Sequence, residues 1–486
     1  MSAPAPNGSA SAASSAPAPS DWSIDSWRTK PISQQPEYSA PTWKDRTAVD
    51  GALDTLRRLP PLVHHAEVDE LRHQLSEVAA GHRFFLQGGD CAERFQDCSQ
   101  KPIEQKFKIL LQMSLILTWG ARLPVVRIGR VAGQYGKPRS SPIEKLPDGT
   151  IVNSFKGDNI NGYEATPESR AHDPQRLIHG HFHSAATLNY IRALIKGGYA
   201  DLHQSQSWDM SGVVNRDKRT RYQEISKQIV DGLDFMEITG IQSRSQSAVK
   251  EVDFFTSHEG LVLDYESAVT KAVPNHLHKA SYYNLGAHFL WIGNRTRQLD
   301  CAHIEYFRGI RNPIGIKVDS EMTGAELITL LDRVDPAREP GRITLITRFG
   351  AEKIWTDLPK LIQAVQNAGR QYTTVWACDP MHGNTYTSKN GLKTRSFDAI
   401  LAELKATFEV HEQYGSHLGG VHFELTGENV TECVGGPQEL AEHHLPLNYT
   451  TYWYVPLSHR CCIRFALSHG RLTWLSLLVV LSPSCV

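Results

Sequence analysis

The stretch Thr373-Thr-Val-Trp-Ala-Cys-Asp-Pro-Met-His-Gly-Asn384 has the pattern of a buried strand that ends in polar residues. Val375–Ala377 is the apolar run, and Asp379-Pro380 ends it. His382 follows on a loop at the C-terminal end of the strand. Active sites of α/β barrels are built at this end. His382 is therefore a candidate metal ligand or acid–base group, although a solvated loop histidine gives the same pattern.

Seven further apolar runs alternate with helical stretches along the chain. They cover residues 84–91, 125–133, 252–259, 288–293, 314–318, 343–350 and 420–427. Eight strands with helical crossovers is the number in a (β/α)8 barrel. A doubly wound open sheet is the alternative, but the chain has no GxGxxG motif or P-loop to support it. We predict an α/β fold, a (β/α)8 TIM barrel.

Local signals mark several of the intervening segments as helices. Thr323 and Glu326 form a capping box before an apolar stripe. Residues 358–365 carry a second stripe, which Gly369 ends. Ser396 caps a third helix. These signals favour helical crossovers between parallel strands.

Changes in composition divide the chain into segments. Residues 1–40 begin rich in Ala, Ser and Pro and stay Pro-rich, so we expect a flexible tail and approach. Residues 41–80 carry two helical patterns and form an expected N-terminal helical extension. We expect the barrel in residues 81–451, with inserted helices at about 140–245 between strands two and three; loops of such length are usually functional. Residues 452–486 form a divergent tail.

Composition excludes several classes of function. The chain is 40% hydrophobic and 21% charged, with a formal net charge of -1, as in an ordinary soluble protein. That charge provides no field for nucleic acid or an anionic membrane, so neither is an expected partner. The 8 cysteines include no CxxC pair, which favours a reducing compartment. The sequence has no secretory or transit signal, so the expected location is cytoplasmic.

Candidate ligands for a metal lie at the ends of different strands. Cys91 ends the first strand, Glu259 ends the third, His382 follows the seventh, and Glu424 lies in the eighth. Cys, His and Glu from separate strands form a candidate divalent-metal site. A buried Cys is alternatively a small hydrophobe. A carboxylate inside an apolar strand is costly unless it is paired or metal-bound.

Cationic side chains converge on the same end of the predicted barrel. They are Arg130, Lys137, Arg139, Arg295, Arg297, Lys317 and Arg348. Arg binds phosphate or carboxylate bidentately and Lys binds as a point charge, while structural pairing with Asp or Glu explains one or two of them equally well. The residues predict a metal-dependent barrel enzyme for small phosphorylated anions. Aldol-type condensation, isomerisation and phosphate hydrolysis all remain open.

Six motifs carry a resemblance to a known family. They are Leu86-Gln-Gly-Gly-Asp-Cys-Ala-Glu93, Arg130-Val-Ala-Gly-Gln-Tyr-Gly-Lys-Pro-Arg139, Thr256-Ser-His-Glu259, Arg295-Thr-Arg-Gln-Leu-Asp300, Asp379-Pro-Met-His-Gly-Asn384 and His422-Phe-Glu-Leu-Thr-Gly427. In this order they resemble type II 3-deoxy-D-arabino-heptulosonate 7-phosphate (DAHP) synthases. The resemblance runs from about Trp22 to Thr451.

The resemblance implies an activity and its setting. Phosphoenolpyruvate and erythrose 4-phosphate condense and phosphate is released, in the first step of the shikimate pathway. A divalent metal is implied, Mn²⁺ first and Co²⁺ second. A homo-oligomer, dimer or tetramer, and aromatic amino acids as effectors are also implied.

The resemblance also assigns roles to residues. The implied metal ligands are Cys91, His382 and Glu424. Phosphoenolpyruvate would be held by Arg130, Arg295, Lys317 and Arg348, and erythrose 4-phosphate by Lys137, Arg139 and Ser140. Glu259 joins the substrate-binding set, and Lys317, Cys91 and His382 are the candidate catalytic residues. The metal would polarise the aldehyde for attack by C3 of phosphoenolpyruvate, and water would add at C2 before phosphate leaves.

The chain departs from the family pattern in two places. Asn294 stands where the family has an acidic residue. Residues 452–486 contain no Asp, Glu or Lys, and Tyr454 stands where the family has an Asp as fourth metal ligand. We interpret this tail as a shifted reading frame or an unspliced intron, with genuine divergence as the alternative. Two other functions follow from it: a defective or regulatory subunit without catalysis, or a protein attached to a membrane by an apolar tail.

Overall fold

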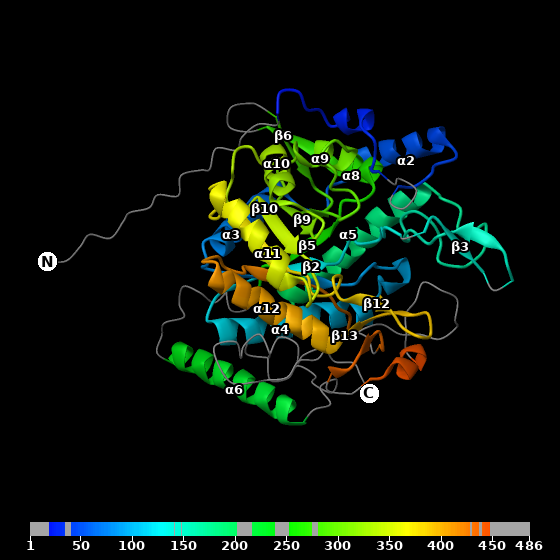
Figure 1. The fold of residues 1–486 in the computed structure, drawn as a ribbon. Helices are drawn as coiled ribbons and strands as arrows, with labels where there is room; N and C mark the ends of the chain where they lie inside the picture. Colours follow the sequence, from blue (N-terminus) through cyan, green and yellow to red (C-terminus); the bar gives the residue numbers. More distant parts are fainter. Residues whose placement is uncertain are drawn as a thin grey trace.

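The computed structural model describes residues 19–34, 40–139, 141–146, 148–201, 216–238, 252–274, 280–427, 430–436 and 440–447. Eight parallel strands form a closed barrel at the centre of the molecule (Figure 1). Around the barrel they are β1 (Phe84–Gly89), β14 (Gly420–Glu424), β11 (Thr374–Cys378), β10 (Ile343–Thr347), β9 (Ile314–Val318), β8 (Phe289–Ile292), β5 (Phe255–Glu259) and β2 (Val125–Arg130). Each lies in a predicted apolar run. The prediction of a (β/α)8 barrel is confirmed, and the open-sheet alternative is wrong.

Helices surround the barrel. The longer ones are α2 (Arg46–Arg58), α3 (His65–Ala79), α4 (Gln100–Ala121), α5 (Gln175–Lys196), α6 (Arg216–Ile238), α10 (Gly324–Val334), α11 (Ile354–Asn367) and α12 (Phe397–Gln413). The short helices α8 (Leu263–Val269) and α9 (Ala302–Phe307) follow β5 and β8. Within the described residues, no helix is long and apolar enough to cross a membrane.

Small sheets lie outside the barrel. Two are hairpins, β3 (Ile143–Lys145) with β4 (Ile151–Asn153) and β6 (Thr270–Pro274) with β7 (Ala280–Asn284). A third contains β12 (Thr385–Thr387), β13 (Lys393–Ser396) and β15 (Cys433–Val434). The hairpin β3–β4 and the helices α5 and α6 occupy the expected insertion, whose limits stay a prediction. Residues 452–486, with Tyr454, lie outside the described part of the chain.

Two apolar layers hold the barrel. Inside it, Phe85, Phe289 and Val375 belong to one buried cluster, which Leu71 and Leu75 of α3 join. A Cβ on Gly341 would lie 2.2 Å from the carbonyl oxygen of Arg72, so α3 lies tightly against the segment that leads into β10. The helix α3 thereby packs over part of the N-terminal end of the barrel.

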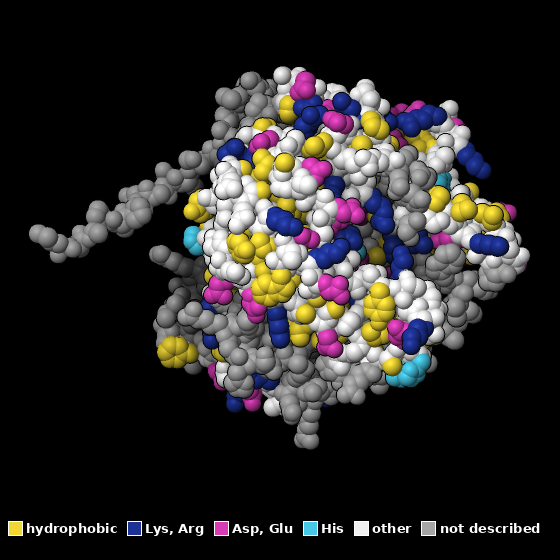
Figure 2. Space-filling view, in the orientation of Figure 1, with side chains coloured by type: hydrophobic (Ala, Val, Ile, Leu, Met, Phe, Trp, Pro, Cys, Tyr) yellow, Lys and Arg dark blue, Asp and Glu magenta, His cyan; other side chains and the backbone are white. Residues whose placement is uncertain are grey.

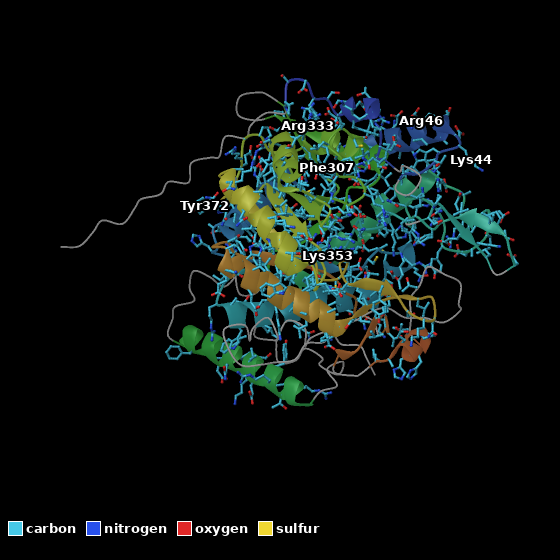
Figure 3. All side chains as sticks on the ribbon, in the orientation of Figure 1. Lys44, Arg46, Phe307, Arg333, Lys353 and Tyr372 are labelled. Atoms are coloured by element: carbon cyan, nitrogen blue, oxygen red, sulfur yellow. The ribbon has the colours of Figure 1, made fainter. Side chains whose placement is uncertain are left out.

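The second apolar layer lies between the strands and the outer helices. Phe307 at the end of α9 is completely buried in it, whereas Tyr372 before β11 is exposed at the edge of the molecule (Figure 3). On the face shown in Figure 2, basic and acidic side chains are interspersed over most of the surface, as the net charge of -1 leads one to expect.

The register of the strands brings distant residues together. Gly89 of β1 is paired with Arg130 on one side and with Glu424 on the other. Both side chains therefore stand at the C-terminal edge of neighbouring strands. The loops that follow β9, β10 and β11 open at the same edge.

The helix signals read from the sequence have the expected geometry. The side chain of Thr323 accepts a hydrogen bond from the Glu326 N–H at 3.2 Å, and Glu326 accepts one from the Thr323 N–H at 2.9 Å. Ser396 accepts from the N–H of Ala399 at 3.4 Å. Gly369 follows α11 with a φ of 67°, the left-handed conformation that glycine adopts without strain.

The capping box of α10 provides a test of this local account. Thr323→Ala removes the acceptor for the Glu326 N–H, so the free energy of unfolding should fall by about 1 kcal/mol. The measurement is urea unfolding followed by circular dichroism. Thr329→Ala, an exposed site in the same helix, is the matched control and should change stability by less than about 0.5 kcal/mol. Equal losses in both variants would contradict the capping account.

Candidate active site

A cavity of about 950 Å³ opens at the C-terminal ends of the strands. Apart from Arg297, every predicted site residue that the structure describes lines it: Cys91, Arg130, Lys137, Arg139, Glu259, Arg295, Lys317, Arg348, His382 and Glu424. Ser140 lies outside the described residues. In Figure 2 basic side chains gather around a hollow in the face shown. The structure thus brings together residues from across the chain, while their roles stay predictions.

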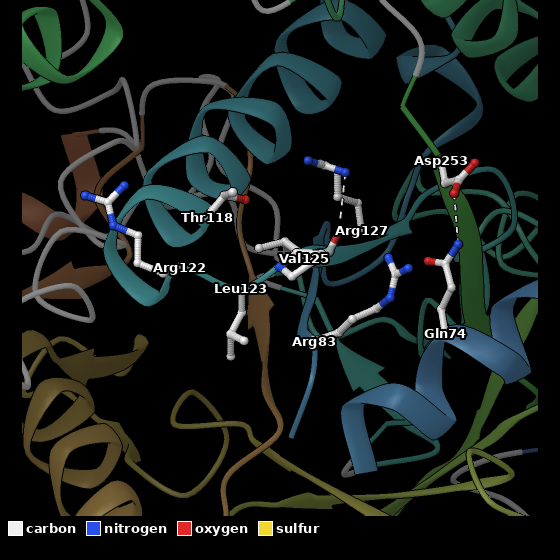
Figure 4. A pocket seen from close by; sticks show the side chains of 9 residues that line it. Gln74, Arg83, Thr118, Arg122, Leu123, Val125, Arg127 and Asp253 are labelled. Carbon is white, nitrogen blue, oxygen red and sulfur yellow. Dashed lines mark hydrogen bonds between the residues drawn. The ribbon is translucent and has the colours of Figure 1, made fainter. Parts of the chain in front are cut away.

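A smaller cavity of about 490 Å³ lies at the opposite end of the barrel. Its lining includes Arg83, Val125 and Asp253, which lie at or just before the beginnings of β1, β2 and β5, and Gln74 of α3 (Figure 4). There the side-chain amide of Gln74 donates to a carboxylate oxygen of Asp253 at 2.8 Å. Catalytic residues of TIM barrels come from the C-terminal end, so the larger cavity is the candidate active site.

Asp379 is the most enclosed charge of this cavity region. It directly follows β11 and has no exposed surface. One carboxylate oxygen accepts Nδ1–H of His382 at 2.7 Å and forms an ion pair with Lys317 Nζ, and the other accepts the N–H of Met381 at 3.0 Å. Burial opposes ionisation, but the charges of His382 and Lys317 hold the pKa of Asp379 well below its usual value.

Lys317 is the cationic partner in the barrel wall. It lies in β9 and is almost completely buried. Burial lowers the pKa of its ammonium group to about 8, and repulsion from Arg130 and Arg348 adds to this shift. The attraction of Asp379 opposes it. Lys317 therefore changes charge close to neutral pH.

Glu424 is surrounded by donors. His382 Nε2 lies 3.0 Å from one carboxylate oxygen, which also pairs with Arg130 at 3.4 Å. Arg395 of β13 donates to the other oxygen at 2.8 Å. Burial raises the pKa of this carboxyl, yet His382, Arg395 and Arg130 together hold it well below the usual value.

The donors present fit part of a metal site. The bond from His382 Nδ1 to Asp379 directs Nε2 toward Glu424, the orientation that a carboxylate gives to a metal-binding histidine. Burial and the charge of Glu424 raise the pKa of the Cys91 thiol, and Lys137 and Arg130 oppose the shift. In the described part of the chain, no three His, Cys, Asp or Glu side chains form a ready metal cluster. The pair His382–Glu424 fits two adjacent ligands, with Cys91 nearby as a third donor.

Arg130 is held rigidly by a hydrogen-bonded chain inside the barrel. It donates to the carbonyl oxygens of Asp90 and Cys91, and to Nε2 of His422 at 2.8 Å. His422 Nδ1 in turn donates to Gln87 Oε1 at 2.6 Å. Burial, with repulsion from Lys317 and Arg130, holds the pKa of His422 well below its usual value, so the imidazole is neutral and accepts from Arg130.

A second group of cations lies toward the entrance. Burial lowers the pKa of Lys393, helped by the charges of Arg139, Arg295 and Lys137. Burial also lowers the pKa of Arg295, where Glu259 opposes the shift. Arg139 is anchored by Glu144 at 2.9 Å. Cations that depress one another's pKa are favourable sites for an anion.

One cation that the sequence analysis places in the site, Arg297, has a structural role instead. Arg297 was grouped with Arg295, but its guanidinium pairs with Asp319 at 2.6 Å and it does not line the cavity. Structural pairing is the correct explanation for it. Asn294 also donates to Asp319, at 2.6 Å, which an acidic residue would not do at neutral pH.

Three residues of the site were not assigned from sequence. Asp379 lies within one of the family motifs, and an acidic residue three positions before a candidate ligand is a usable signal for it. Lys393 and Arg395 lie on β13, outside the barrel strands. The rule that sites lie at barrel strand ends gives no signal for them.

A closed parallel barrel with a cation-lined cavity at the C-terminal ends of its strands is the arrangement of a TIM-barrel enzyme for small anionic substrates. Comparison with known proteins narrows this class. Residues 22–467 match the Class-II DAHP synthetase family. The chain therefore belongs to the class II DAHP synthase family.

Individual relatives agree with this assignment. A phospho-2-dehydro-3-deoxyheptonate aldolase from Neurospora crassa is 47% identical over 92% of this chain and 93% of its own. Proteins of the same name from Streptomyces coelicolor and Mycolicibacterium smegmatis are 46% and 42% identical, each over 88% of this chain and over 92% and 89% of their own lengths. A solved structure from Francisella tularensis shares 13% identity with a TM-score of 0.39, too weak a likeness to carry an argument.

The pKa of Lys317 predicts how anion binding depends on pH. Because burial lowers this pKa to about 8, the ammonium is charged below pH 8 and loses its charge above it. Binding of sulfate, whose own charge is constant over this range, should weaken by roughly tenfold between pH 7 and pH 9.5. Isothermal titration calorimetry measures the affinity. Lys317→Arg keeps its charge throughout, so a fall of the same size in that variant would assign the effect to another group.

Proposed function

We propose that this chain condenses phosphoenolpyruvate with erythrose 4-phosphate to form DAHP and phosphate, the first step of the shikimate pathway. The observation that carries the proposal is that the His382–Glu424 pair and a cluster of cations lie in one and the same cavity at the mouth of the barrel. Membership of the class II DAHP synthase family supports the same reaction.

Phosphoenolpyruvate would bind to four cations that line the cavity. Arg130, Arg295, Lys317 and Arg348 provide charge for its phosphate and carboxylate groups. The Nε of Arg348 is buried and has no hydrogen-bond partner among the described residues, as expected of a donor whose acceptor is a ligand. Glu259 lies among the same cations: burial raises its pKa, while Lys317, Arg130 and Arg295 oppose the shift. Its carboxylate would orient Arg295.

Erythrose 4-phosphate would bind nearer the entrance. Lys137, Arg139 and Ser140 are its proposed phosphate ligands, and we add Lys393 because its charge is coupled to Arg139 and Lys137. This arrangement would direct the aldehyde toward Cys91 and His382. C3 of phosphoenolpyruvate would then attack the aldehyde carbon, and water would add at C2 before phosphate leaves. The surrounding cations would neutralise the charge that develops.

The proposed cofactor is Mn²⁺, with Co²⁺ as the alternative. Cys91, His382 and Glu424 would hold it, and Asp379 would fix the His382 tautomer that leaves Nε2 free to bind. When bound, such an ion polarises a carbonyl as a Lewis acid. The fourth ligand of the family falls at Tyr454, outside the described residues.

The wider setting is also a proposal, and it rests on the family resemblance of the sequence. It comprises a homo-oligomer, a cytoplasmic location and aromatic amino acids as effectors. No finding favours the alternative of a non-catalytic or regulatory subunit.

The function is tested by an assay of phosphate release. The purified chain with both substrates and Mn²⁺ should release phosphate, EDTA should abolish the release, and added Mn²⁺ should restore it. Glu424→Gln should weaken Mn²⁺ binding by more than about tenfold, since it replaces a charged ligand with a neutral one. No turnover with Mn²⁺ or Co²⁺ in the full chain would reject the proposed activity.

Arg348 provides a test of substrate binding. Arg348→Ala removes a charge from the proposed phosphoenolpyruvate site, so kcat/KM for this substrate should fall by roughly 100- to 1,000-fold. Steady-state kinetics with each substrate varied in turn measures the effect. Arg333→Ala, an exposed arginine on α10, is the matched control and should leave the kinetics unchanged. An unaltered kcat/KM in Arg348→Ala would exclude Arg348 from the site.

A further inference from the structure

Glu403 is a buried carboxylate that does not line the active-site cavity. It lies in α12, behind the loops that follow β10 and β11, and has no exposed surface. One carboxylate oxygen accepts the backbone N–H of Phe349 at 2.8 Å. The other accepts the side-chain amide of Asn384 at 2.7 Å. A single side chain thereby links two loops of the barrel mouth.

Each of these loops carries a residue of the proposed site. Phe349 directly follows Arg348, and Asn384 lies two positions after His382. Arg348 also donates to the carbonyl oxygen of His382 at 3.2 Å. The position of Arg348, which would bind phosphoenolpyruvate, is therefore coupled to that of His382, the candidate metal ligand. Glu403 holds both loops from the side away from the cavity.

Asn384 completes the link between the two loops. Its Nδ2 donates to the carbonyl oxygen of Pro380 at 2.8 Å as well as to Glu403. Its Oδ1 accepts the N–H of Ala351 at 3.0 Å. Both ends of the amide are thus occupied, and the orientation of Asn384 has only one solution in which every bond is made.

The backbones of the two loops are in direct contact at Gly350 and Gly383. A Cβ on Gly383 would lie 2.3 Å from the nitrogen of Gly350, and a Cβ on Gly350 would lie 2.7 Å from the oxygen of Gly383. Backbone contact this close means that a shift of one loop is transmitted to the other.

Both carboxylate oxygens of Glu403 face N–H donors, so a side chain that accepts at both positions fits this place. A glutamine of the same shape would place an N–H₂ group against either the Phe349 N–H or the Asn384 amide, donor against donor. A buried carboxylate is costly, and burial raises the pKa of Glu403 to about 7 while the donors of Gly350, Phe349 and Asn384 oppose the shift. The cost is consistent with a constraint on the loops rather than with simple packing.

We propose that Glu403 is a positioning residue that sets the relative placement of Arg348 and His382, and through them couples substrate binding to metal binding. The inference rests on the proposed function for its ligands. It does not require Glu403 to touch either one. The inference predicts that one substitution at Glu403 lowers the affinity for both ligands together.

The test uses the full chain and two ligands measured separately. Mn²⁺ binding is followed by the electron paramagnetic resonance signal of free Mn²⁺, and phosphoenolpyruvate binding by tryptophan fluorescence, since Trp291 lines the cavity. Glu403→Gln should weaken both affinities by roughly 10- to 100-fold, the usual cost of removing a partner that orients a metal ligand. Glu409→Gln, on an exposed position of the same helix, is the matched control and should leave both affinities unchanged.

A double variant separates the polarity of the link from loss of packing. In Glu403→Gln with Asn384→Asp, the new amide donates to the new carboxylate, whose second oxygen still accepts the Ala351 N–H, while the bond to the Pro380 carbonyl oxygen is lost. This variant should therefore recover only a part of both affinities. Unchanged binding of both ligands in a folded Glu403→Gln chain would overturn the inference. Wild-type chain that binds neither ligand would instead overturn the proposed function, and this inference with it.

Discussion

The ion pair between Asp379 and Lys317, shared with His382, is the interaction on which the candidate site depends. A carboxylate without exposed surface is stable only when cations and donors surround it. Here the cation comes from β9 and the imidazole from the loop after β11, so the group spans the strand that lies between them. The same bonds fix the tautomer of His382 and direct its other nitrogen toward Glu424.

Charge is arranged in two zones around this group. In the inner zone each carboxylate has cationic partners, as Glu424 has Arg130 and Arg395. Nearer the entrance, Lys393 and Arg295 repel one another and their neighbours, which lowers both pKa values beyond the effect of burial. Binding of a phosphorylated anion would relieve that repulsion. The inner zone thus suits chemistry at a metal, and the outer zone suits recognition of phosphate.

Most of the fold followed from pattern because the strands of a parallel barrel are buried on both faces. The run Ile314–Val318 is apolar except for Lys317, which is conspicuous for that reason. Residues at strand ends were found by the same logic. Arg295 and Arg297 were not separable, because both follow β8 within a few residues. Only the observed pairing with Asp319 shows that Arg297 serves the structure.

The sequence by itself determined the eight strands, the helix caps and the strand-end residues, since these depend on local periodicity and on neighbours along the chain. Tertiary structure alone decided which side chains meet. Arg395 reaches Glu424 from a strand outside the barrel, and Glu403 reaches two active-site loops from a helix behind them. Such contacts depend on how loops fold back in three dimensions. Hydrogen bonds between residues far apart in the chain leave no period in the sequence from which to predict them.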